Sequence, residues 1–249
     1  MILNGKSSDA NGVSQNVKSV EILDLDDISK PFTCDNFPDT IGVRYGVAGI
    51  IDNTPVWCGG KDENGDKVSH CEKLNVENEV WEHAADLKDG KLSMGKGTII
   101  VKGKLMVSGG YLDNTGETDT IELVSLDSSS VADFSLPIPL YGHCNIKVER
   151  GTYLITGGRS NSKHRIETHY QNFINGTWWD GPSMNVDRRY HACTKFELNG
   201  INYALVVGGD SSTTSVEYLN LDEPESTWVV ANSEYIFIKC ENRMQQTRT

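Results

Sequence analysis

The sequence predicts an all-β fold built from about five copies of one four-stranded antiparallel unit. Pairs of glycines end four apolar runs at nearly equal intervals, and a glutamate followed by a large aromatic residue recurs after each run. The composition agrees with this prediction. The chain has 24 glycines in 249 residues and only 8% aromatic residues, which is typical of a single β domain with many turns.

The glycine pairs close the runs VWCGG, LMVSGG, YLITGG and ALVVGG, at spacings of 50, 48 and 51 residues. A continuously apolar run is expected for a strand that is covered on both faces. A glycine pair lets the backbone leave that strand with positive φ or pass close to a neighbouring strand. A degenerate fifth copy lies at the N-terminus, where Asn4 and Gly5 replace the pair. The repeat glycines are Gly59, Gly60, Gly109, Gly110, Gly157, Gly158, Gly208 and Gly209.

An alternating strand that carries a glutamate follows each loop, and a large aromatic residue comes 9 to 12 positions later. We expect this aromatic side chain to fill the gap between adjacent sheets. Another strand precedes each glycine pair, so one period holds four strands, and sheets of this size stacked around an axis make a β-propeller. The glutamates are Glu21, Glu72, Glu122, Glu167 and Glu217, and the aromatic residues are Phe32, Trp81, Phe134, Trp178 or Trp179, and Trp228.

This pattern resembles the kelch repeat. The best match is WWDGPSMNVDRRYHACTKFELNGINYALVVGGDSSTTSVEYLNLDEPESTW, which has the family's Trp, Met, Arg, double Gly, Glu-Tyr and Trp in order. The resemblance covers nearly the whole chain to Trp228 and implies kelch blades, but it says little about activity. The first repeat lacks one glycine, the first and third have Phe for Trp, and Met94-Gly95 stands where the second would have an Arg.

The repeats predict one propeller domain over residues 1–240, with a disordered tail over 241–249. The repeats span about 1–44, 45–95, 96–142, 143–190 and 191–240. The segment EYIFIK, residues 234–239, is expected to pair with Ile2 and Leu3 and to close a five-bladed ring. The alternative is an incomplete six-bladed propeller, whose open edge would favour aggregation.

Charge excludes one class of partner. The net charge of −12 repels nucleic acid, and no apolar run is long enough for membrane insertion. The start of the chain has no signal-peptide pattern. The oligomeric state does not follow from the sequence.

The cysteines bear on the compartment. Cys58 directly precedes a glycine pair and Cys71 lies in the next strand, so a hairpin would bring them close enough to bridge. The alternative is two buried thiols. This arrangement looks like that of secreted or cell-surface kelch proteins, and without the bridge we expect a cytoplasmic protein. Asn175-Gly176-Thr177 is a glycosylation sequon on a turn. No partner is expected for Cys34, Cys144, Cys193 or Cys240.

We expect a protein that is not an enzyme and has no metal and no cofactor. Asp62, Asp66 and His70 have the spacing of one helix face, but DENGD is typical of a turn, where that spacing loses its meaning. The copper oxidases built on kelch blades use tyrosine, histidine and cysteine. In this chain such residues fall at equivalent places in two repeats, which indicates the repeat rather than a copper site.

The resemblance implies a binding site instead. In kelch domains that capture peptides, the partner-binding residues lie just before the first strand of each blade and just after the glycine pair. Arginine and tyrosine suit such a surface, because they combine area with directional hydrogen bonds. Carried over, the first group is Arg44, Tyr45, Lys91, Tyr141, Arg189 and Tyr190, and the second is Lys61, Tyr111, Arg159 and Asp210.

A ring of cations would attract an acidic peptide. The alternative for each of these residues is a role in bracing loops. Three functions remain open: a protein-interaction module, such as the substrate-receptor part of a ubiquitin-ligase adaptor; a secreted or surface protein that binds protein or glycan; and a metal- or sugar-acting kelch enzyme.

Overall fold

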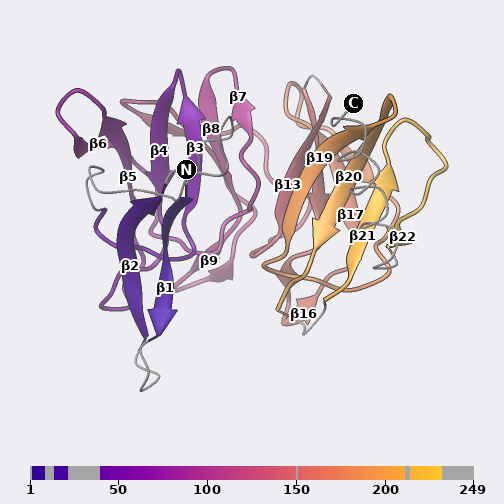
Figure 1. Cartoon of the computed structure of the whole chain (residues 1–249), viewed down its shortest axis with the longest axis horizontal. Helices are drawn as coiled ribbons and strands as arrows, with labels where there is room; N and C mark the ends of the chain where they lie inside the picture. The colour runs from indigo at the N-terminus through magenta and orange to yellow at the C-terminus, as the bar shows by residue number, and fades with distance from the viewer. Residues whose placement is uncertain (1, 9–13, 22–39, 150, 211–213, 232–249) are drawn as a thin grey trace, which may run out of the picture. The chain divides into compact units, whose positions relative to one another are not determined.

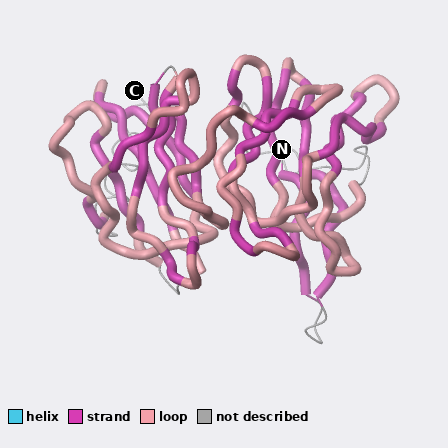
Figure 2. The backbone as a smooth tube through the Cα atoms, turned by 180° about the vertical axis from the view of Figure 1, so that it is seen from behind, coloured by secondary structure: helices cyan, strands magenta, loops and turns pink. Residues whose placement is uncertain are grey.

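The computed structural model describes residues 2–8, 14–21, 40–149, 151–210 and 214–231. The regular structure in these ranges consists of β-strands, which confirms the predicted all-β class (Figure 2). No helix in the described ranges is long and apolar enough to cross a membrane.

Four antiparallel sheets of four strands form the blades, and within each blade the strands lie in chain order (Figure 1). The first blade contains β3 (Val47–Ile51), β4 (Thr54–Cys58), β5 (His70–Asn75) and β6 (Val80–Asp86). The second contains β7 (Ile100–Val101), β8 (Lys104–Ser108), β11 (Ile121–Val124) and β12 (Ser129–Val131). The third contains β13 (Cys144–Glu149), β14 (Thr152–Thr156), β17 (Thr168–Asn172) and β18 (Trp178–Asp180). The fourth contains β19 (Ala192–Leu198), β20 (Ile201–Val207), β21 (Val216–Asn220) and β22 (Val229–Val230).

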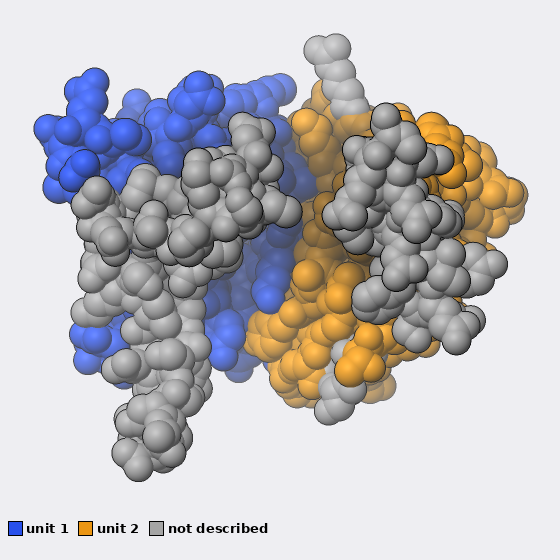
Figure 3. All heavy atoms as spheres, in the orientation of Figure 1, with its two compact units in different colours: residues 1–141 blue, residues 142–249 orange. Residues whose placement is uncertain are grey.

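Short two-stranded ribbons occupy two of the loops that follow glycine pairs. They are β9 (Tyr111–Leu112) with β10 (Gly116–Glu117), and β15 (Arg159–Ser160) with β16 (Lys163–His164). The chain divides into two compact units, residues 1–141 and 142–249, which Figure 3 colours separately. This boundary coincides with the end of the third sequence repeat.

The degenerate N-terminal copy forms a hairpin of β1 (Ile2–Ser8) and β2 (Ser14–Glu21). Ile2 pairs with Glu21, as Trp57 pairs with Glu72 in the first blade, so β1 and β2 correspond to β4 and β5. The register shifts between Leu3 and Gly5, but β1 continues to Ser8. The predicted closing strand at 234–239 and the aromatic Phe32 lie outside the described residues.

The predicted glutamate lies on the strand after the loop in the first, second and fourth blades, opposite the residue two positions before the glycine pair. In the third blade the prediction was wrong. Glu122 pairs with Val107 and Glu217 with Val206, each two positions before a glycine pair. In the third blade the residue at that position, Ile155, pairs with His169. Glu167 instead precedes β17 and is exposed. Residues two apart in a strand share a face, so alternation alone could not choose between Glu167 and His169.

A buried ion pair joins strand and loop in unit 2. Glu217 and Arg188 are each 0% exposed, with 2.9 Å between the Arg188 guanidinium and the Glu217 carboxylate. The backbone N–H groups of Asn185 and Val186 also donate to this carboxylate, at 2.7 and 3.2 Å. Arg188 donates in turn to the carbonyl of Gly208 at 2.7 Å. The connection into the fourth blade is therefore held from inside.

Unit 1 repeats this arrangement with a lysine. The Lys91 ammonium lies 2.5 Å from the Glu122 carboxylate, and both side chains are buried. The backbone N–H of Lys88 donates to the same carboxylate at 2.7 Å. Lys91 is at the position equivalent to Arg188. The backbone N–H of Gly60 donates to the Lys91 carbonyl, and the backbone N–H of Gly158 donates in the same way to the Arg188 carbonyl. The cation expected near Met94-Gly95 is present, three positions earlier.

The third blade has neither partner of this pair. His169 occupies the position of the glutamate. Leu140, which is 1% exposed, occupies the position of the cation, because its carbonyl accepts a hydrogen bond from the backbone N–H of Gly110. A buried cation without its carboxylate would be strongly unfavourable, so the joint loss of both is physically consistent.

Each unit has a core between its own blades. In unit 1, Val56 and Ala85 of the first blade pack in one cluster with Leu105 and Val107 of the second. In unit 2, Leu154 packs in a cluster with Val206, Leu219 and Trp228. Trp228 fills the gap between sheets as predicted, since it is 4% exposed. The prediction was wrong for Trp178 and Trp179, which are 48% and 46% exposed.

Two disulfides join cysteines within the described residues. Cys58 and Cys71 are bridged across β4 and β5, which is the first of the two alternatives that the sequence left open, with 4.0 Å between their Cα atoms. Cys144 and Cys193 are also bridged, with 6.1 Å between Cα atoms. The expectation that these two had no partner was wrong. They lie on β13 and β19, the first strands of consecutive blades, which are in contact, although their positions in the two strands differ by one residue. Cys34 and Cys240 lie outside the described residues.

The ion pair gives a prediction about stability. Glu217→Gln leaves the Arg188 charge buried without a full counter-charge, so we expect the free energy of unfolding to fall by about 3 kcal/mol. Glu167→Gln is the matched control, because its exposed pair with Arg165 should contribute less than about 0.5 kcal/mol. Urea denaturation measures both. Equal effects of the two substitutions would contradict the register described above.

The second disulfide gives another prediction. It closes a sequence separation of 49 residues, against 13 for Cys58–Cys71. Loop-closure entropy then predicts a loss of about 4 kcal/mol for the double variant Cys144→Ser, Cys193→Ser, and of about 3 kcal/mol for Cys58→Ser, Cys71→Ser. Peptide mapping of the unreduced, alkylated wild-type protein should show both pairs intact. Free thiols at Cys144 and Cys193 would refute the assignment.

Candidate functional site

Each described blade is entered through a residue in the left-handed backbone region. The four residues are Tyr45, Ser93, Gly142 and Tyr190, with φ of 63°, 58°, 64° and 57°. They hold equivalent places just before the first strand of each blade. We use the word corner for such a tyrosine together with the cation before it and the residue that pairs with this cation across the blade entrance. The corners are Arg44, Tyr45 and Lys61 in unit 1, and Arg189, Tyr190 and Asp210 in unit 2.

In unit 1 two backbone hydrogen bonds form the corner. Arg44 N–H donates to the Lys61 carbonyl at 3.0 Å, and Lys61 N–H donates to the Arg44 carbonyl at 2.8 Å. The guanidinium carbon of Arg44 lies 5.9 Å from the centroid of the Tyr45 ring, which is within the range of a cation–π contact. Tyr45 is 47% exposed. The corner therefore presents an aromatic ring and a cation together.

The corner of unit 2 has the same plan with one change. Arg189 stacks on Tyr190 at 5.0 Å and forms an ion pair with Asp210, whose N–H donates to the Arg189 carbonyl at 3.1 Å. Tyr190 N–H donates to the carbonyl of Gly142 at 2.7 Å, so this corner is also tied to the entrance of the third blade. The structure therefore places three of the predicted binding residues, Arg189, Tyr190 and Asp210, in contact with one another.

The two tyrosines occupy positions that favour glycine. A left-handed backbone costs a residue with a side chain about 1–2 kcal/mol, and Gly142 meets the same requirement without that cost. Strained backbone is found most often where a side chain serves recognition or catalysis. The presence of tyrosine at two of the four corner positions is the strongest indication of a functional surface on the chain.

An aromatic row extends the corner of unit 1. Tyr111, 37% exposed, meets Tyr141 edge to face at 5.3 Å between centroids. The ammonium of Lys67 lies 4.7 Å from the Tyr111 ring and 2.5 Å from the Asp113 carboxylate, and Lys67 forms a β-bridge with Lys61. The sequence did not identify Lys67. The repeat could have pointed to this position. Lys67 lies five residues before the repeat glutamate Glu72, and the charged residue Glu117 lies five residues before Glu122 in the next blade.

Three predicted binding residues are not part of either corner: two are buried, and the third lies on the β15–β16 ribbon. Lys91 is 1% exposed and pairs with Glu122, and Tyr141 is 7% exposed, so neither offers much surface. Arg159 is half-buried on β15, where it pairs with His164 across the ribbon. In the described part of the chain, Arg159 has no ion pair with a carboxylate, and its Nε has no hydrogen-bond partner.

The acidic loop forms the expected turn. Asp66 N–H donates to the Asp62 carboxylate at 2.8 Å, and Asp62 N–H donates to the Asp66 carbonyl at 3.0 Å. Within the described ranges, no group of three His, Cys, Asp or Glu side chains has the geometry of a metal site. His143 is 0% exposed, and its burial lowers the pKa to about 3, so the imidazole is neutral at physiological pH.

Four-stranded blades that repeat one register define a β-propeller protein. The chain matches no protein-family model and no curated protein sequence. Among solved structures it is similar to the one titled "Structure of YjhT", with a TM-score of 0.70 and 12% sequence identity. The match covers 92% of this chain and 80% of that chain. At such low identity the likeness shows a shared fold alone.

The left-handed corner gives a prediction that tests its geometry. Tyr45→Gly should be more stable than Tyr45→Ala by about 1 kcal/mol, because only glycine relieves the positive φ. At an ordinary strand position the order is reversed, since glycine loses more backbone entropy than alanine. The same pair of substitutions at Lys104, within β8, is the control. Thermal or urea unfolding of the four variants measures the difference, and the same order at both positions would contradict the assigned φ.

Proposed function

We propose that the chain is a non-enzymatic interaction module, a propeller of kelch type that binds a protein or peptide partner through its corners. The observation that carries this proposal is the pair of Arg-Tyr corners, in which a strained tyrosine is held next to a cation. Arg and Tyr are the residue types that contribute most to binding energy at protein interfaces. A fold-level likeness supports the scaffold, whereas the function is argued from these residues.

The partner we propose is acidic. Unit 1 places three cations, Arg44, Lys61 and Lys67, at and beside its corner, where Lys67 pairs with Asp113 and the loop between the two lysines carries Asp62, Glu63 and Asp66. Unit 2 adds Arg159, which has no carboxylate partner among the described residues. The proposed contact is therefore between the individual cations of the corners and carboxylates of the partner, on a chain whose net charge is −12.

We further propose that the protein works in an oxidising compartment, as a secreted or surface binding protein would. Both disulfides support this, because structural disulfides are rare in the reducing cytosol. Asn175 of the sequon is exposed in the turn between β17 and β18. These observations favour this setting over that of a cytosolic ubiquitin-ligase adaptor.

The experiment is affinity purification from the native source with quantitative mass spectrometry. The bait is the wild-type chain or the double variant Arg44→Glu, Arg189→Glu. The matched control is Lys102→Glu, Lys147→Glu, which makes the same change in charge at exposed lysines outside the corners. We expect a partner that is retained by the control and reduced at least about tenfold with the corner variant, because attraction becomes repulsion.

Two further measurements keep the result interpretable. Circular dichroism and thermal unfolding should show that both double variants are folded. Binding of the recovered partner should weaken as the salt concentration rises, because the corner charges are at the surface. A partner lost equally from both variants, or retained by both, would refute the corner assignment.

A further inference from the structure

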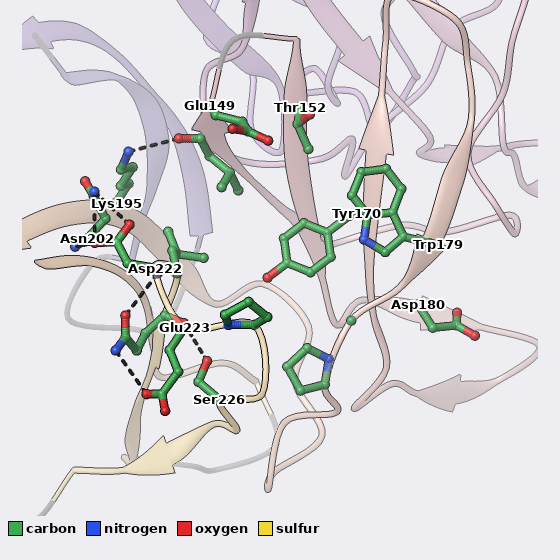
Figure 4. Close-up of a pocket in the computed structure, with 16 residues that line it drawn as sticks. Glu149, Thr152, Tyr170, Trp179, Asp180, Lys195, Asn202, Asp222, Glu223 and Ser226 are labelled. Carbon is green, nitrogen blue, oxygen red and sulfur yellow. Dashed lines mark hydrogen bonds between the residues drawn. The ribbon is translucent and has the colours of Figure 1, made fainter.

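A groove lies between the third and fourth blades in unit 2 (Figure 4). Its volume is about 520 Å³, which is within the range of sites that bind small ligands or single side chains. Its walls come from the ends of the strands: β17 and β18 on one side, and the β20 start and the turn after β21 on the other. No corner residue lines it.

The third blade supplies an aromatic wall. Tyr170 and Trp179 are paired residues of β17 and β18, and their rings stack at 5.5 Å with 15° between their planes. Trp179 is 46% exposed and takes the place of Val229 in the fourth blade, because it pairs with Tyr170 as Val229 pairs with Tyr218. Burial raises the pKa of Tyr170, so its phenol stays neutral. Figure 4 shows the Tyr170 hydroxyl pointing toward the Asp222–Ser226 turn. The aromatic pair therefore faces the groove as a fixed, uncharged surface.

The fourth blade supplies ionised carboxylates. Asp222 accepts hydrogen bonds from the backbone N–H of Asn202 at 2.7 Å and from its amide Nδ2 at 3.0 Å. These bonds lower the pKa of Asp222. Glu223 accepts from the Asn220 amide at 3.4 Å. Amide donors hold both carboxylates in place, and the Lys195 ammonium adds a smaller electrostatic attraction to Asp222.

The described residues that line the groove carry more negative than positive charge. They include the carboxylates of Glu149, Asp180, Asp222 and Glu223 and the ammonium of Lys195. Asp180 is 3.0 Å from the His169 imidazole, and Lys195 donates to the Val148 carbonyl at 2.9 Å. Asp222 and Glu223 thus remain opposite the aromatic wall, which is an arrangement that complements a cation rather than an anion.

We propose that this groove binds an arginine side chain of a partner protein. A guanidinium is planar, so it can stack on the Tyr170–Trp179 wall while its N–H groups donate to the carboxylate of Asp222. A lysine ammonium would make the charge contact without the planar stacking. The corners attract acidic segments, so the groove is a second site with the opposite preference.

The site does not rest on the proposed function of the corners. Arg189 and Asp210 flank the entrance to the β19–β20 hairpin, whereas Asn202 lies beside its turn. With about 3.4 Å of rise per residue, the two surfaces are about 20 Å apart along the hairpin. Each can therefore be removed without the other.

The test measures binding of a short blocked peptide, acetyl-Gly-Arg-Gly-amide, to the whole chain by isothermal titration calorimetry or NMR. The same peptide with citrulline in place of arginine keeps the shape and removes the charge. We expect citrulline to weaken binding at least about tenfold, which is the loss of about 1.4 kcal/mol. Affinity for arginine should also fall several-fold as salt rises from about 50 to about 500 mM.

Matched variants locate the binding. Trp179→Ala and Asp222→Asn should each weaken arginine binding at least about tenfold. Trp178→Ala is the control for the first, because Trp178 has similar exposure but contacts His169 and does not line the groove. Asp127→Asn, an exposed carboxylate of unit 1, is the control for the second. Glu223→Gln serves as a second charge variant if Asp222→Asn does not fold.

Several outcomes would overturn the proposal. The first is equal binding of the arginine and citrulline peptides, and the second is no binding at about 10 mM peptide. The third is that Trp179→Ala and the charge variants bind the arginine peptide with the wild-type affinity. Salt-independent binding of neutral oligosaccharides, such as lactose or chitobiose, that Trp179→Ala abolishes would identify a glycan site instead. The corner variant Arg44→Glu, Arg189→Glu should bind the arginine peptide like wild type, so the two proposals fail separately.

Discussion

The fully buried Glu217–Arg188 pair is the constraint on which unit 2 depends. One carboxylate gathers the backbone N–H groups of Asn185 and Val186 together with a guanidinium that is itself bonded to the end of β20. Two buried charges are tolerable only when hydrogen bonds satisfy almost every donor and acceptor, as they do here. The residue that follows Arg188 is the corner residue Arg189. The position of the unit 2 corner is therefore set by an interaction inside the blade.

The corners and the groove show two ways in which a regular scaffold departs from its own repeat. At the corners, tyrosine occupies a left-handed position where glycine would be more stable. At the groove, Trp179 stands where the fourth blade has Val229, and its half-exposed ring stacks on Tyr170. Local departures of this kind are expected at functional sites, because the other levels of structure are mutually consistent.

The sequence was sufficient for the fold class and the strand order, because glycine pairs and alternating strands fix turns and faces. It left the Cys58–Cys71 bridge open against two buried thiols, and the structure has the bridge. It misplaced the third-blade register, since Glu167 and His169 share a face and only strand pairing distinguishes them. It missed Cys144–Cys193, which depends on the adjacency of two blades rather than on a hairpin. It assigned Lys91 to the surface, although the buried carboxylate of Glu122 holds it inside. Each miss involves a contact that is distant in sequence.

Amide hydrogen exchange on the wild-type chain, resolved by NMR, tests most directly whether the corners are held from inside. The account predicts that the amides of Asn185, Val186 and Lys88, although they lie in loops, exchange as slowly as those of the neighbouring core strands, because they donate to buried carboxylates. Exchange at the rate of exposed loop amides, such as that of Glu225, would contradict it. In that case the buried carboxylates would not hold the connections that position the corners.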